Sequence, residues 1–168
     1  PMNFAPRTLT SDLTNHNAGD FKEIFNEIKF RYKNRDAEGL WHNYEIIADK
    51  YGTVQSLLED VDYDAVKLVE RLEEDGFKYL KGVKLAPFYA RVIHDEVHEL
   101  ERIWEVDIPV DTHIRTLTQR LADEELTDDE IRKFWRHKAE MLDVSPHLVD
   151  GALWHMGNQW DEWGEEYF

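Results

Sequence analysis

The chain has 168 residues, which is enough for one domain, and 42% of them are hydrophobic and 12% aromatic, which excludes a disordered or fibrous protein. It contains no cysteine, so disulfides, zinc–thiolate sites, iron–sulfur clusters and thiol nucleophiles are excluded. The 36 acidic and 20 basic residues give a net charge of −16, which opposes nucleic-acid binding except through a local basic patch. No apolar run approaches the roughly 18 residues that span a bilayer, and the first residues lack a signal-peptide core, so we expect a cytoplasmic protein with no membrane partner.

Apolar residues recur at helical spacing along almost the whole chain. Before them, residues 1–17 are rich in Pro, Asn, Thr and Ser, which indicates an N-terminal arm. We therefore predict one helical domain over residues 18–168, an all-α compact bundle of about eight helices. In chain order, the helices are expected to include residues 21–32, 40–51, 54–61, 65–72, 84–104, 114–121, 131–142 and 148–163.

Several residues predict where these helices begin and end. Gly52 and Gly76 stand where a helix should stop, because glycine adopts the left-handed conformation that often follows a helix. Thr53 and Thr127 can cap the helices that follow them. Ser145 precedes a proline, which suits a cap followed by the first helical turn.

Two short segments could carry chemistry. In LKGVK, Gly82 allows a tight turn and Lys84 stands at the start of the next helix, whose free N–H groups suit a phosphate oxygen. In IPVDTHI, Asp111 follows Pro109 and is a natural N-cap. An amine and a carboxylate that face each other across a cleft can act as nucleophile and electrostatic partner. The alternative is that Asp111 is only a helix cap and Lys84 an ordinary surface lysine.

LKGVKLA followed by PVDTHIRTLTQRL resembles the helix-hairpin-helix DNA glycosylases, the superfamily of endonuclease III and 8-oxoguanine glycosylase. Within it, IPVD and the short hairpin look most like the compact archaeal 8-oxoguanine glycosylases. The likeness covers about residues 38–160. It implies the fold of that superfamily and a monomeric DNA glycosylase with AP-lyase activity, associated with the nucleoid when bound to DNA. Such an enzyme needs no cofactor, and it excises a damaged base, with 8-oxoguanine the first candidate, from double-stranded DNA.

The resemblance also implies roles for individual residues. Lys84 would be the Schiff-base nucleophile that attacks C1′ of the deoxyribose, and Asp111 would stabilise the oxocarbenium-like charge. A flipped base needs an aromatic surface to stack on, and we take Trp41 and Trp154 as candidates for this pocket. The residues expected to contact the DNA backbone are Lys81, Gly82, Val83 and Arg115.

The hairpin departs from the family pattern, because its second glycine is missing. An alignment without a gap places Ala86 at the lysine position, and Lys81 is a rival nucleophile. The departures and the net charge favour an alternative, a non-catalytic DNA- or protein-binding module with the same fold. If DNA is the ligand, we expect a positive island around the hairpin, formed by Lys78, Lys81, Lys84, Arg91 and Arg115.

The segment HDEVH suggests a different class of site. His94 and His98 are one helical turn apart, as in zinc-binding helices. The residue after the first histidine is Asp95 rather than Glu, and a third ligand is not evident, although His113 and His137 are candidates. We therefore predict no metal site and a solvated helix face.

Arginine and histidine spaced as in some helical ribonucleases give a last alternative. Arg91 with His98, and Arg132 with His137, have this spacing. The chemistry would be cleavage of RNA by an imidazole acid and base, with the arginine holding a phosphate. In a chain with eight histidines such a spacing arises easily by chance.

Overall fold

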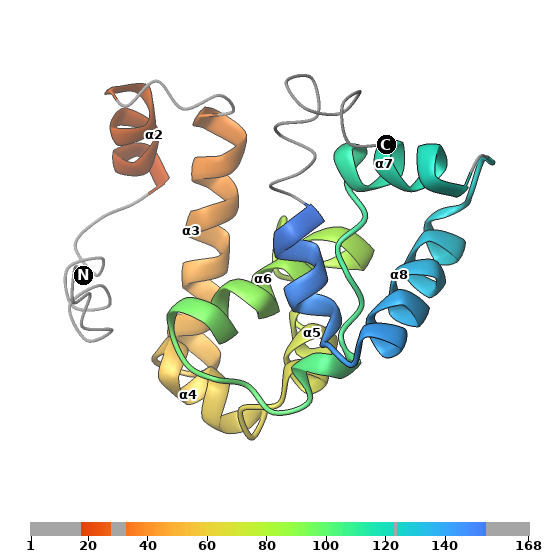
Figure 1. Ribbon diagram of the computed structural model, residues 1–168. Coiled ribbons are helices and arrows are strands. Elements are labelled where there is room, and N and C mark those ends of the chain that lie inside the picture. The colour runs from red at the N-terminus through yellow and green to blue at the C-terminus, as the bar shows by residue number, and fades with distance from the viewer. Residues whose placement is uncertain (1–17, 28–32, 123, 154–168) are drawn as a thin grey trace.

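The computed structural model describes residues 18–27, 33–122 and 124–153, and in these ranges the chain is mostly helical (Figure 1). Among them, the β-type pairing is limited to an isolated parallel bridge between Asp64 and Glu101. The prediction of an all-α fold is therefore confirmed. The elements are α2 (Ala18–Glu27), α3 (Lys33–Lys50), α4 (Val54–Asp60), α5 (Ala65–Glu74), α6 (Gly82–Glu96), the 3-10 helix η1 (Ile103–Glu105), α7 (Thr112–Ala122) and α8 (Asp128–Leu142), and residues 146–153 are also helical.

The predicted helix boundaries around α4, α5 and α8 are confirmed. A backbone N–H of the first turn of α4 donates to the Thr53 hydroxyl at 3.0 Å. Thr127 and Glu130 form a reciprocal capping box at the start of α8. Gly52 and Gly76 adopt φ values of +78° and +73°, which a side chain would strain. These boundaries follow from local chemistry alone.

The prediction that α6 continues to about Trp104 is wrong. After the helix ends, Leu100 donates its backbone N–H to Nδ1 of His94 at 2.9 Å. The next residue, Glu101, donates its N–H to the carbonyl of Tyr63 at 2.8 Å. The backbone N–H groups of Leu100 and Glu101 therefore bond to a side chain of α6 and to a distant segment instead of continuing the helix, which the helical spacing of the sequence does not reveal.

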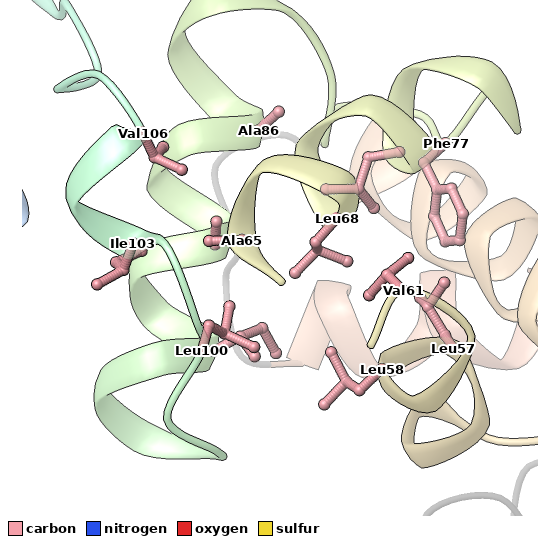
Figure 2. Close-up of a cluster of buried hydrophobic side chains, with 13 residues drawn as sticks. Leu57, Leu58, Val61, Ala65, Leu68, Phe77, Ala86, Leu100, Ile103 and Val106 are labelled. Carbon is pink, nitrogen blue, oxygen red and sulfur yellow. The ribbon is translucent and has the colours of Figure 1, made fainter. Parts of the chain in front are cut away.

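The described core has two clusters. The larger one lies between α4, α5, α6 and η1, and Figure 2 shows its side chains pointing toward one another. Its buried members are Leu57, Leu58, Val61, Ala65, Leu68, Leu72, Phe77, Ala86, Ala90, Ile93, Leu100, Ile103 and Val106. The second joins α7 and α8, and its members are Ile108, Val110, Ile114, Leu117, Ile131, Trp135 and Leu153. The residues that connect η1 to α7 pass from the first cluster to the second.

The helices are arranged around these two clusters. In Figure 1, α2 and α3 lie on the left, α7 and α8 on the right, and α5 and α6 between them. α2 packs on α3, where Lys22 and Glu38 form an ion pair at 2.6 Å. None of the described helices is long and apolar enough to cross a membrane.

Candidate functional site

Asp111 is the N-cap of α7. Its Oδ1 accepts the backbone N–H of Ile114 at 2.9 Å, which confirms the predicted cap. Pro109 and Val110, which precede it, are both buried and fix the chain at the entry to the helix. The carboxylate is half-buried, so it is held in one place and still reachable.

Lys84 lies in the first turn of α6. The turn begins at Gly82, whose φ of +77° confirms that the chain needs a glycine there. The Lys84 side chain is exposed. Ala86, the residue that an ungapped alignment places at the lysine position, is 1% exposed and belongs to the core. Ala86 therefore does not stand at a position suited to a nucleophile, whereas Lys84 and the N-cap residue Lys81 are both exposed at the start of the helix.

Lys84 and Asp111 line the same cavity. It has a volume of about 230 Å³ and lies between α6, the start of α7 and the helical residues 146–153. Its lining residues are Lys84, Leu85, Phe88, Arg91, Pro109, Asp111 and Asp150. The rival nucleophile Lys81 is exposed and is not among them. The fold thus brings together the two segments that the sequence singled out.

A buried ion pair forms the inner wall of this cavity. Arg91 pairs with Asp150, and their side chains are only 17% and 4% exposed. The Arg91 guanidinium also lies 5.0 Å from the centre of the Phe88 ring. We did not predict Asp150 or Phe88 as site residues. Phe88 lies one helical turn from Lys84, so helical spacing could have found it, whereas the pairing with Asp150 depends on tertiary structure.

The residues predicted to contact the DNA backbone differ in their surroundings, although Lys81, Gly82 and Val83 are all exposed. Gly82 donates its backbone N–H to Oε2 of Glu73 at 3.0 Å, so this N–H is already in use. Val83 is 51% exposed and lines a different groove. Arg115 forms an ion pair with Asp128 at 2.7 Å.

The predicted positive island is reduced by ion pairs inside the chain. Arg91 and Arg115 are each held by an aspartate, whereas Lys78, Lys81 and Lys84 are exposed. A carboxylate is also present at the hairpin, because Glu73 accepts the N–H of Gly82. Three lysines around the hairpin thus remain as the cations that a phosphate could meet.

The two tryptophans predicted for a base pocket have different outcomes. Trp41 lies on α3, donates its Nε1–H to Glu45 at 2.9 Å and packs against Tyr44. It is not among the residues that line the cavity with Lys84. Trp154 lies outside the described residues. Among the described residues, Phe88 is the aromatic residue that lines this cavity.

The histidines of HDEVH do not act as a pair in the structure. His98 stacks on the Tyr63 ring, with 4.3 Å between the ring centres. His94 instead lies near Asp95 and His147, with possible ligand atoms within 4.8 Å of one another. The third ligands that we considered, His113 and His137, are not in this group.

The hydrogen bonding of His94 argues against a metal there. Its Nδ1 accepts the N–H of Leu100, so the proton of the neutral ring is on Nε2. A metal ligand has the reverse arrangement, in which one ring nitrogen binds the metal and the other donates its proton. His94 is therefore a poor ligand while the bond to Leu100 is formed.

The arginines of the ribonuclease hypothesis are engaged elsewhere. Arg91 pairs with Asp150, and Arg132 pairs with Asp129 on the same helix. His137 is highly exposed on α8, where it faces Glu140 at 3.9 Å. Neither histidine of these pairs lines the cavity with Lys84.

Comparison with known proteins does not assign the chain to a family. No family model, no curated protein and no solved structure matches the chain.

Proposed function

We propose that this chain is a helix-hairpin-helix DNA glycosylase with AP-lyase activity that removes a damaged base, 8-oxoguanine in the first instance, from double-stranded DNA. The observation that carries the proposal is the cavity that Lys84 and Asp111 line together. These residues stand in the two segments that resemble the glycosylase signature, LKGVK and PVDTH. Their shared cavity supplies the nucleophile and the anionic partner that the chemistry needs.

The reaction requires the damaged nucleotide to leave the base stack, since C1′ is inaccessible inside the duplex. The unprotonated amine of Lys84 attacks C1′, the glycosidic bond breaks, and the base leaves with its electron pair and takes up a proton. The carboxylate of Asp111 stabilises the positive charge that develops on the sugar. The Lys84 nitrogen loses a proton and forms a Schiff base as the C1′–O4′ bond of the sugar ring breaks and O4′ takes up a proton. Loss of the C2′ proton from this Schiff base then expels the 3′ phosphate.

The remaining walls suit a flipped base. The Phe88 ring offers a flat apolar surface, and Leu85 adds an aliphatic one. Arg91 and Asp150 place hydrogen-bond donors and acceptors on the inner wall, where they can meet the polar edge of the base. A cavity with an apolar surface and a few fixed polar groups is typical of a selective small-ligand site.

The direct test is trapping with borohydride, which reduces a Schiff base to a stable adduct. Wild-type protein is mixed with duplexes that contain 8-oxoguanine or an abasic site, and adducts are resolved by gel electrophoresis. We expect an adduct with the wild type and with Lys81→Gln, and its loss in Lys84→Gln. Persistence of the adduct in Lys84→Gln, or no wild-type adduct with either duplex, contradicts the proposal.

A second candidate function is a non-catalytic binding module with the same fold. The observation that favours it is the bond from Gly82 to Glu73, which occupies an N–H that would otherwise meet a phosphate. Fluorescence anisotropy with a lesion-containing duplex, run beside a base-excision assay, separates the two functions. Binding without excision of 8-oxoguanine favours the module, whereas excision that depends on Lys84 favours the enzyme.

A further inference from the structure

A larger groove lies on another face of α6. Its volume is about 660 Å³, and it is bounded by α5, the start of α6, the residues around η1, and α8. Val83 and Pro87 line it, whereas Lys84 and Phe88 line the cavity described above. Because these pairs lie on different faces of the helix, the groove is separate from the candidate catalytic site.

The floor of this groove is apolar. It is formed by the hydrocarbon side chains of Val66, Val69, Val83, Ala86, Pro87 and Val106. Val83 is 51% exposed, which is high for a valine beside the main core. An open apolar surface of this kind gains free energy when another apolar side chain covers it.

The rim is acidic. Glu70, Glu73 and Glu74 are exposed along α5, and Glu105 and Asp107 stand at the opposite side. Among the residues that the structure describes, the cation that lines the groove is Arg132, which is paired with Asp129. Three of the carboxylates have cationic partners as well: Glu74 faces Arg71, Glu105 faces Arg102, and Asp107 pairs with Arg136. Glu70 and Glu73 are exposed carboxylates with no ion pair in the described part of the chain, so this side of the groove attracts a positively charged ligand.

The charges of the groove also indicate which class of macromolecule could bind there. Nucleic acid is repelled by this rim, because its phosphates carry the same sign. A second copy of the chain is disfavoured as well, since each copy has a net charge of −16. Many surface cations of this chain are already paired, among them Arg71, Arg102, Arg115 and Arg136.

We propose that this groove binds a segment of a partner protein that is rich in Lys and Arg and carries aliphatic side chains. The aliphatic side chains would cover the valines of the floor, and the cations would pair with Glu70, Glu73 and Glu74. The apolar contact supplies affinity, while the charges orient the segment and speed its association. This groove is distinct from the cavity at Lys84, but Gly82 and Val83, which are expected to contact the DNA backbone, line it.

The test measures binding of a labelled peptide, Lys-Lys-Leu-Arg-Ile-Lys-Lys, by fluorescence anisotropy. Reversing two rim charges in Glu70→Lys/Glu74→Lys is expected to weaken binding by about 10-fold or more. The matched control, Glu96→Lys/Glu99→Lys, makes the same charge change at exposed positions outside the groove. We expect it to change the affinity by less than about 2-fold, because salt screens distant charges.

A second variant tests the floor. Val83→Ser is expected to weaken binding of this peptide about 3-fold or more. A second peptide, in which Ser replaces Leu and Ile, should bind the wild type more weakly. Val83→Ser should leave the affinity for this second peptide unchanged. Because Val83 is half-exposed, we expect the variant to fold, which circular dichroism checks.

Three outcomes overturn the proposal. One is the absence of binding by the Leu- and Ile-containing peptide at low salt. Another is an equal loss of affinity in the rim variant and in its control, which would show attraction by net charge alone. The third is self-association of the free chain, seen by sedimentation velocity and abolished by Glu70→Lys/Glu74→Lys, which would assign the groove to a second copy.

Discussion

Asp111 is a helix cap in the structure and has a second role in the proposed reaction. Its carboxylate holds the first turn of α7 through the N–H of Ile114 and also faces the cavity with Lys84. The cap requires an oxygen that accepts a hydrogen bond, which Asn provides about as well as Asp. The proposed reaction requires a negative charge, which Asn lacks. One substitution therefore separates the two roles.

In Asp111→Asn, we expect the free energy of unfolding to change by less than about 0.5 kcal/mol, since the cap is retained. Excision of 8-oxoguanine should fall by roughly 10²-fold or more, because a charge that stabilises the transition state is lost. Urea unfolding and single-turnover excision measure the two quantities. Excision at the wild-type rate in this variant would reduce Asp111 to a helix cap.

The pair formed by Arg91 and Asp150 gives a second prediction at this scale. Asp150 is almost fully buried, so Arg91→Met leaves its carboxylate without a partner. We expect a loss of about 3 kcal/mol in the free energy of unfolding, and recovery of most of it in Arg91→Met/Asp150→Leu. Urea unfolding of both variants checks this. A single variant as stable as the wild type would show that the pair is not coupled.

At the scale of elements, the sequence predicts those helix boundaries that depend on residues close together in the chain. Thr53, Thr127 and Gly76 mark helix boundaries because caps and left-handed residues act within a few positions of the chain. The end of α6 could not be predicted, because it depends on partners distant in the chain, as the bond between Glu101 and Tyr63 shows. The Arg91–Asp150 pair could not be predicted for the same reason.

The start of α6 carries a prediction about the hairpin. Glu73 accepts the N–H of Gly82, and Glu73→Ala frees this N–H and removes a negative charge beside it. If the hairpin binds phosphate, the affinity for duplex DNA should rise about 3- to 10-fold. Glu74→Ala is the control, because it removes the same charge from the neighbouring position on α5. Equal effects of the two variants in anisotropy titrations would assign the gain to net charge.

We expect His147, in the helix at residues 146–153, to make the stability of the fold depend on pH. Burial lowers the pKa of His147, and the neighbouring His94 and Arg91 lower it further, against the opposite effect of Asp95. The unfolded chain therefore binds a proton at this histidine more readily than the folded one. Stability should fall as the pH decreases below about 6.5, the ordinary pKa of histidine, down to the lowered pKa of the folded state.

This dependence is measured by urea unfolding of the wild type and His147→Gln at pH 7.5 and 5.5. The variant should lose less stability than the wild type over this interval. His137→Gln, at an exposed position of α8, is the control and should behave as the wild type does. An identical loss in all three proteins would show that His147 titrates alike in the folded and unfolded chain.

At the scale of the whole molecule, the charges are divided between two surfaces. The groove on one face of α6 has carboxylates around an apolar floor, while the exposed Lys84 lines the cavity on another face and Lys78 and Lys81 are exposed nearby in the chain. The net charge of −16 therefore does not determine which ligand binds, because a ligand responds mainly to the charges of the surface that it contacts. The composition predicts the total charge, but only the fold shows how it is distributed.

The central claim is that Lys84 is the amine that attacks C1′ in the cavity it shares with Asp111. The most direct measurement is mass spectrometry of the protein after borohydride trapping on an abasic duplex, followed by proteolysis and sequencing of the modified peptide. The account predicts one deoxyribose adduct, on the Nζ of Lys84. An adduct on Lys81 or on another lysine, or no adduct at all, would contradict it.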